Sequence, residues 1–163
     1  MSALSRHPDI QLVRAAPDDA GRIQAMLKES FAGLLEKYQD YDTNPATMTV
    51  EAVRLRLDQE QTYYYFIVAD GETVGGIRVV DWKDRQTRKR ISPLFVLPAY
   101  RNRGIAQQAM TMAEALHGPA HWMLDTVLQE KGICYLYEKM GYHQTGHTRI
   151  VNERMTLVFY EKD

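Results

Sequence analysis

The chain has 163 residues, of which 45% are hydrophobic and 25% are charged, as in an ordinary globular domain. Its 20 basic and 21 acidic residues give a formal net charge of −1, which leaves no broad basic field to hold a nucleic acid. The one cysteine, Cys134, excludes an intrachain disulfide and a four-thiolate zinc site. No apolar run approaches the ~20 residues that cross a bilayer, and residues 1–15 do not resemble a signal peptide. We therefore expect a cytoplasmic protein with no nucleic-acid or membrane partner.

This length predicts one domain. Residues 1–8 contain little that could pack and are expected to be a loose N-terminal end, which leaves residues 9–163 as a single domain. Within it, a first strand is expected at 10–14, followed by a helix from about Pro17 to Phe31. A second helix is expected at about 49–61.

Three strands come next in the predicted order. Aromatic and β-branched residues at 63–69 lead into Asp70-Gly71, a hairpin signal, and then into a second arm at 73–82. Gly75 and Gly76 in that arm indicate a bulge or a close approach by another backbone. The third strand is expected at about 89–96.

The pattern changes after Pro98. Apolar residues at helical spacing predict a helix of about 16 residues, or roughly 24 Å, that ends at Gly118-Pro119. A strand at 121–127, a helix over about 133–140 and two strands at 143–152 and 155–160 complete the chain. The order β-α-α-β-β-β-α-β-α-β-β indicates an α/β (α+β) fold with a mixed sheet and helices on its faces.

The segment from Phe95 to Ala106 carries the most chemical information, because it runs from a strand through a turn into a helix. Unpaired N–H groups at a helix N-terminus suit a phosphate, and Arg101 and Arg103 add positive charge there. Gly104 in the first turn costs about 1 kcal/mol relative to alanine, which suggests that a ligand or a second backbone comes close.

The spacing Arg-x-x-Gly-x-Ala at 101–106, preceded by Val-x-Pro at 96–98, resembles the acyl-CoA signature of the GNAT superfamily of N-acetyltransferases. Leu-Tyr-Glu-Lys-Met-Gly-Tyr at 136–142 is similar to the family's late tyrosine motif, and the element order is the family's own. The resemblance implies a mixed, mostly antiparallel central sheet of about seven strands with helices on both faces.

The same resemblance implies acetyl-CoA as co-substrate, with no metal, held in a gap between the fourth and fifth strands. The pyrophosphate would meet backbone amides of the loop, and the pantetheine arm would run along the fourth strand. The implied contacts are Leu94, Phe95, Val96, Arg101, Asn102, Arg103, Gly104, Ile105, Ala106 and Gln107.

The implied reaction is direct attack of a primary amine, on a small molecule or a peptide, on the thioester within a ternary complex. Tyr137 occupies the position of the general acid in similar enzymes, with a packed core aromatic as the alternative. The residues do not identify the base. Asp125 and Glu130 are the candidates, and Asp81 faces the same cleft in a further interpretation, with a surface carboxylate as the alternative for each of them and water as the alternative base. Arg90 occupies a site where many relatives place a glutamate, and Glu130 one where many place a cofactor-binding asparagine.

A non-catalytic acyl-CoA-binding or regulatory module on the same fold is the alternative function, because no base is assigned. Cys134 is expected to be a small packed core residue, and the histidines are expected at the surface without metal spacing. The strand at 155–160 could pair across a homodimer.

Overall fold

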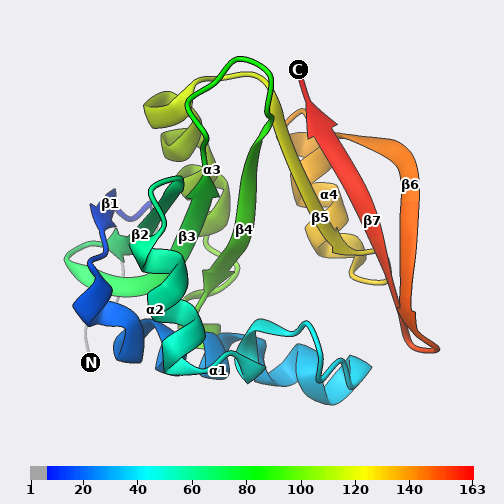
Figure 1. Cartoon of the computed structure of the whole chain (residues 1–163), viewed down its shortest axis with the longest axis horizontal. Coiled ribbons are helices and arrows are strands. Elements are labelled where there is room, and N and C mark those ends of the chain that lie inside the picture. The colour runs from blue at the N-terminus through cyan, green and yellow to red at the C-terminus, as the bar shows by residue number, and fades with distance from the viewer. Residues whose placement is uncertain (1–6) are drawn as a thin grey trace.

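Residues 7–163 form one seven-stranded sheet, in the strand order β1-β2-β3-β4-β5-β7-β6 (Figure 1). The computed structural model describes residues 7–163. All neighbouring strands are antiparallel except β4 and β5, which are parallel. The strands are β1 (Ile10–Arg14), β2 (Thr62–Ala69), β3 (Glu72–Val80), β4 (Lys89–Val96), β5 (Trp122–Val127), β6 (His143–Asn152) and β7 (Met155–Lys162).

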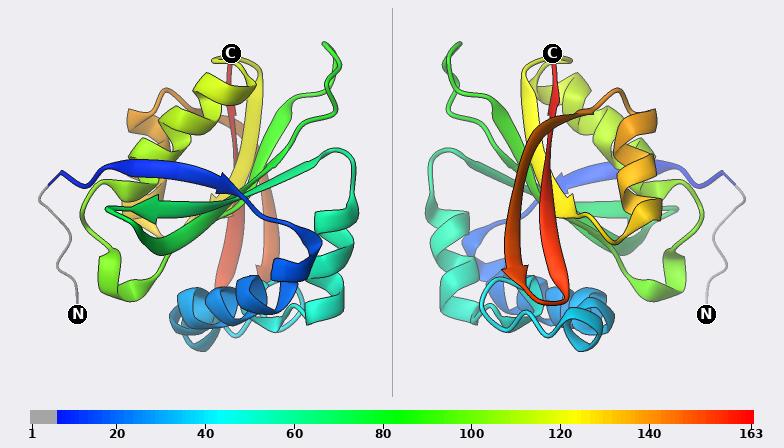
Figure 2. Two further views of the ribbon diagram at one scale, coloured as in Figure 1. Left: turned by 90° about the vertical axis from the view of Figure 1, so that its left-hand side faces the viewer. Right: turned by 90° about the vertical axis from the view of Figure 1, so that its right-hand side faces the viewer.

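The four α-helices of the described residues cover the two faces of this sheet (Figure 2). Strand β2 shows why both faces are buried: Tyr64 and Phe66 pack with α1 and α2, whereas Tyr65 and Ile67 pack on the face that α3 and α4 cover. Successive side chains of a strand point to opposite faces, so an all-apolar strand such as β2 needs cover on both. The helices are α1 (Ala20–Tyr38), α2 (Val50–Asp58), α3 (Ile105–His117) and α4 (Lys131–Lys139).

The predicted element order and the mixed, mostly antiparallel sheet are confirmed. Two helix lengths were wrong. The first helix runs on to Tyr38 and ends at Gln39, whose φ of 54° is left-handed. The helix after Pro98 has 13 residues, because it begins only after Gly104 and ends at Gly118. Of the end predicted at 1–8, residues 1–6 lie outside the described part of the chain, and Pro8 is buried.

Strands β4 and β5 pair over a short length only. Their register joins Lys89 to Trp122 and Arg90 to Met123, and beyond these residues the strands separate, as Figure 1 shows. A bulge accounts for the separation, since Ser92 and Pro93 of β4 stand opposite a single residue of β3. A bulge bends its strand and increases the local twist. The C-terminal half of β4, which includes Leu94–Val96, therefore pairs with β3 but not with β5.

The predicted close approach at Gly75 and Gly76 is confirmed. A Cβ on Gly75 would collide with the backbone of Phe95, and one on Gly76 would lie 2.5 Å from the Phe95 ring. The two glycines therefore let β3 and β4 pack tightly, which fixes the β4 segment that follows the bulge.

The prediction that the last strand pairs across a dimer was wrong for this sheet, because β7 already has β5 on one side and β6 on the other. The two edges of the sheet are β1 and β6. No helix within residues 7–163 is both long and apolar enough to cross a membrane.

Candidate functional site

A cleft of about 660 Å³ opens where β4 and β5 separate. Its walls come from the second half of α1, the end of β4, the loop after Pro98, the start of α3, and α4. Every residue predicted to contact the cofactor lines this cleft except Arg103, which is exposed and outside it. The lining members of that set are Leu94, Phe95, Val96, Arg101, Asn102, Gly104, Ile105, Ala106 and Gln107.

The edge of β4 turns main-chain groups toward this cleft. The Leu97 N–H donates to the Val74 carbonyl of β3 at 2.8 Å. Because alternate residues of a strand hydrogen-bond to the same neighbour, the N–H groups of Leu94 and Val96 point away from β3, toward the space that β5 has left. The Val96 carbonyl confirms this direction, since it accepts the Nε–H of Arg101 at 2.9 Å. An extended ligand can therefore pair with β4 as a missing strand would.

The loop before α3 presents successive main-chain donors to the same cleft. The first hydrogen bond of the helix runs from Gln108 N–H to Gly104 carbonyl at 3.1 Å. Within residues 7–163, the amides of 102–107 have no main-chain or side-chain acceptor. These donors and the positive end of the helix dipole suit an anion of two or more oxygens.

Gly104 owes its identity to backbone conformation rather than to a close protein neighbour. Its φ is +72°, a left-handed value that costs other L-residues about 1–2 kcal/mol. A Cβ built there meets no atom of residues 7–163 within 4 Å, so of the two expected neighbours, a ligand or a second backbone, the described residues supply no backbone. The space beside Gly104 is open and belongs to the cleft.

The side chain of Arg101 links two walls of the cleft by hydrogen bonds. In addition to its bond to Val96, its Nη2 donates to the Ser30 carbonyl at 2.7 Å. The guanidinium thus joins β4 to α1 across one end of the cleft, where it also contributes positive charge.

A second cavity, of about 330 Å³, adjoins the first. The residues that line both are Phe31, Leu34, Leu94, Ile133 and Tyr137. The second cavity differs from the first in being rich in charge, since Asp40, Arg56, Arg90, Asp125 and Arg149 line it. Two joined compartments of this kind suit two substrates that meet at their junction.

Tyr137 lies at that junction and is 8% exposed. Its hydroxyl has no hydrogen-bond partner within residues 7–163. Burial, with smaller contributions from Asp125 and Cys134, raises the pKa of Tyr137 well above its ordinary value. The hydroxyl therefore stays protonated and can donate to a ligand at the junction.

The two carboxylates predicted as bases lie in different compartments. Asp125, on β5, lines the second cavity with Tyr137 and accepts a hydrogen bond from Arg90 at 2.7 Å. Glu130, before α4, lines the first cleft and binds Lys37 at 2.7 Å and the Tyr38 hydroxyl. Burial by itself would raise the pKa of Glu130, but the hydrogen bonds from Lys37 and Tyr38 hold it below its usual range.

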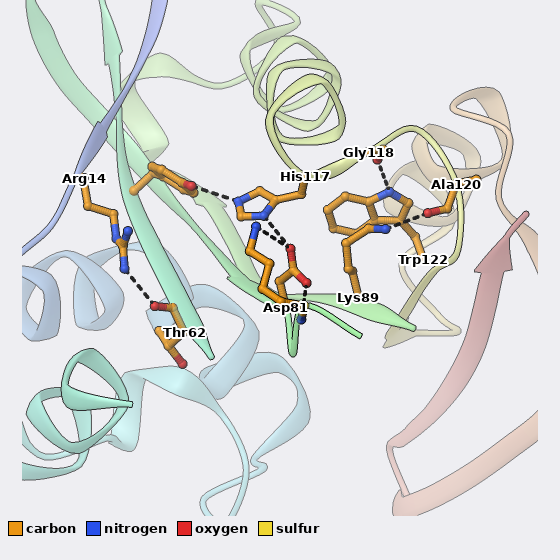
Figure 3. Close-up of polar contacts among 10 residues, drawn as sticks. Arg14, Thr62, Asp81, Lys89, His117, Gly118, Ala120 and Trp122 are labelled. Carbon is orange, nitrogen blue, oxygen red and sulfur yellow. Dashed lines mark hydrogen bonds and ion pairs between the residues drawn. The ribbon is translucent and has the colours of Figure 1, made fainter. Parts of the chain in front are cut away.

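Asp81 lies outside both cavities, so the interpretation that it faces the cleft was wrong. It binds His117 Nδ1 at 2.8 Å, as Figure 3 shows, and Lys83 at 3.2 Å. His117 Nε2 in turn shares a hydrogen bond of 2.8 Å with the Tyr65 hydroxyl. The prediction of surface histidines therefore fails at His117, whose side chain is 3% exposed. This cluster joins the end of α3 to the sheet.

Cys134 is buried as predicted, and its thiol lies 3.6 Å from the Val127 carbonyl. In the described part of the chain, no three His, Cys, Asp or Glu side chains gather as metal ligands would.

Sequence reasoning missed two parts of the site. The first is the stretch of α1 from Ser30 to Lys37, which lines the cleft because the helix continues past its expected end. The second is the set of arginines in the second cavity that come from elements far apart in sequence, Arg56 on α2 and Arg149 on β6. No local pattern marks either arginine as a site residue.

Solved structures with the same fold include several acetyltransferases. The PaiA N-acetyltransferase of Thermoplasma acidophilum, in complex with coenzyme A, is 15% identical with a TM-score of 0.71, covering 95% of this chain and 99% of that one. Spermidine N-acetyltransferase of Vibrio cholerae, in complex with CoA and spermine, is 12% identical with a TM-score of 0.73, covering 93% of each chain. A ribosomal-protein-alanine N-acetyltransferase of Escherichia coli is 10% identical with a TM-score of 0.70, covering 93% and 92%.

A comparison with curated protein sequences finds no match. The family profile of the acetyltransferase (GNAT) domain matches residues 60–144, which extend from β2 through α4 and contain β4, the donor loop and Tyr137. Because this match spans more than half of the chain and the whole fold agrees with it, the chain belongs to the GNAT family of N-acetyltransferases.

Proposed function

We propose that this protein transfers an acetyl group from acetyl-CoA to a primary amine of a small molecule or peptide, directly and within a ternary complex. One observation carries the proposal: the amides of 102–107 have no protein acceptor within the described residues and lie beside a cleft of about 660 Å³. Hydrogen bonds to a charged group contribute about 1.5–3 kcal/mol each, so a few of these amides can hold a pyrophosphate without a basic surface.

The residues fit the rest of the co-substrate as well. The N–H groups of Leu94 and Val96 face the space between β4 and β5, where the amide-bearing pantetheine arm can pair with them. Phe31 and Leu34 of α1 supply apolar cover from the opposite wall. The acyl end would then reach the junction with the second cavity, beside Tyr137.

The chemistry at the junction requires two proton transfers. An alkylamine with a pKa of about 10.4 is neutral in only about one molecule in 2,500 at pH 7, so a base that removes its proton matters. Both carboxylates are ion-paired, Asp125 with Arg90 and Glu130 with Lys37. Asp125 is the better placed for this step because it lines the second cavity, where the amine would bind, whereas Glu130 lines the cleft that the co-substrate would fill. Water between Asp125 and the amine would serve as the relay.

Tyr137 is proposed as the general acid for the departing thiolate. Its hydroxyl is unpartnered among residues 7–163, lies at the junction and stays protonated because burial raises its pKa. The electron pair that attacks comes from the neutral amine, the C–S bond breaks, and Tyr137 supplies the proton that the sulfur takes up.

The nature of the acceptor does not follow from the fold, since similar structures act on acceptors as unlike as spermidine and a ribosomal-protein alanine. A cytoplasmic location and a homodimer stay predictions from the sequence.

An acceptor screen tests the proposal. Purified protein is incubated with acetyl-CoA and a panel of amines, and release of free CoA thiol is followed together with the mass of the acetylated product. Turnover with at least one amine is expected. Binding of CoA by calorimetry without turnover on any acceptor would favour the non-catalytic module, and no binding of CoA would contradict the proposal as a whole.

A further inference from the structure

The second cavity carries more positive than negative charge. Arg56 on α2, Arg90 on β4 and Arg149 on β6 line it, against the carboxylates of Asp40 and Asp125. Asp40 accepts hydrogen bonds within its own loop, and Asp125 is bound to Arg90 at 2.7 Å. Among residues 7–163, Arg56 and Arg149 therefore have no carboxylate partner.

A further guanidinium lies beneath this wall. Arg78 of β3 is 8% exposed, and its one hydrogen bond within the described residues goes from Nη1 to the Ser92 carbonyl at 2.8 Å. The Nε atoms of Arg78 and Arg90 and the Tyr64 hydroxyl are buried without a partner. Burial, and then repulsion from Arg56 and Arg90, lowers the pKa of Arg78 to about 10. Buried cations are costly without a countercharge, and among residues 7–163 the one carboxylate that binds an arginine of this group is Asp125, since Asp40 binds Thr43.

We infer that the acceptor carries an anionic oxygen group, a carboxylate or a phosphate, in addition to its amine, and that this group binds between Arg56 and Arg90. The inference rests on the proposed function, because it describes the acceptor of that same site. Guanidinium groups bind both kinds of anion through two parallel hydrogen bonds. Asp125 is bound to Arg90 and lines this cavity together with Tyr137, so the ammonium end of a zwitterion would meet the Asp125 carboxylate.

Matched pairs of acceptors test the inference by turnover. The first pair is glutamate and glutamic acid diamide, which keeps the amine but has no free carboxylate. The second pair is phosphoethanolamine and ethanolamine. Spermidine is added as a polycation. The anionic member of a pair is expected to have a kcat/KM roughly tenfold to a hundredfold higher than its neutral partner, as hydrogen bonds to a charged group imply. The pair that responds distinguishes a carboxylate from a phosphate. Preference for spermidine or for the neutral members would overturn the inference.

Variants of two arginines on α2 test whether Arg56 causes the preference for the anionic acceptor. Arg56→Gln is expected to remove the preference for the anionic member, and Arg56→Lys to keep part of it, because a point charge replaces the planar fork. Arg54→Gln is the matched control on α2, since Arg54 is exposed and its one ion pair is with Asp18 at 3.9 Å. The same preference in Arg56→Gln as in the unchanged protein would contradict the assignment.

A binding experiment separates this inference from the proposed function. Thermal unfolding is followed with inorganic phosphate or succinate at constant ionic strength, in the unchanged protein and in Arg56→Gln and Gly104→Asn. The part of the anion-induced rise in Tm that depends on Arg56 reports the second cavity, and the part that depends on Gly104 reports the donor loop. If neither anion has an effect that depends on Arg56, the inference fails even when CoA binds. If the Arg56-dependent effect is present but CoA does not bind, the inference stands and the proposed function fails.

Discussion

Replacement of Gly104 separates two roles that this residue has in the donor loop, a backbone role and a spatial role. Its φ of +72° costs an ordinary L-residue about 1–2 kcal/mol, which in a protein of this size lowers Tm by about 2–8 °C. Asparagine tolerates this region far better than alanine, and Asn102 of the same loop already has a φ of 65°. We therefore expect Gly104→Ala to be less stable than Gly104→Asn.

The affinity for CoA should follow the opposite order. In the part of the chain that the structure describes, no atom lies within 4 Å of a Cβ at Gly104, so an added side chain enters open space of the cleft. Asparagine reaches further into that space than alanine and should weaken CoA binding more, by at least the tenfold that one lost hydrogen bond to a charged group represents. Thermal unfolding ranks the two variants by stability, and calorimetry with CoA ranks them by affinity. CoA binding by Gly104→Asn as tight as in the unchanged protein would show that no anion approaches this residue.

Two further predictions concern single side chains. Tyr137→Phe should lower kcat by about 10²–10⁴ while the Kd for CoA stays the same, and full acetyl transfer by this variant would remove the proposed general acid. Stability should also fall in mild acid, because burial lowers the pKa of His117 against the opposing effect of Asp81. In mild acid the unfolded chain therefore binds one proton more than the folded chain at this histidine. The contribution of neutral His117 to the free energy of unfolding is complete above about pH 6.5 and is lost as the pH falls through the pKa of His117 in the folded protein. Urea midpoints between pH 5 and 8 measure the effect, and an unchanged pH dependence in His117→Gln would contradict it.

The sequence predicted the β4-loop-α3 part of the site well because its signals are local. Proline and glycine at fixed positions, then apolar residues at helical spacing, determine a strand, a turn and a helix start within a dozen residues or so. The same segment contains the main-chain donors, so residues that line the cleft could be predicted one by one. Arg103 is the exception, since the side of a loop on which a side chain lies depends on the φ values of its neighbours.

Contacts between distant segments could not be predicted in this way. His117 looks like any residue at the end of an amphipathic helix, and only the folded sheet brings Asp81 and Tyr65 to it. Arg56 and Arg90 are likewise 34 positions apart in the sequence (90 − 56), and they line the same cavity because α2 packs on the sheet, against β2. The second cavity is built from such contacts, whereas one continuous segment, residues 94–107, supplies about half of the lining of the first cleft.

The central claim is that the main-chain donors of residues 102–107 bind the diphosphate of CoA. Backbone amide NMR spectra of the ¹⁵N-labelled protein, recorded during a titration with CoA, test it most directly. The account predicts that the amide protons of this segment shift downfield together and saturate with the Kd measured by calorimetry. Saturable binding of CoA that leaves these amides unshifted would contradict the claim.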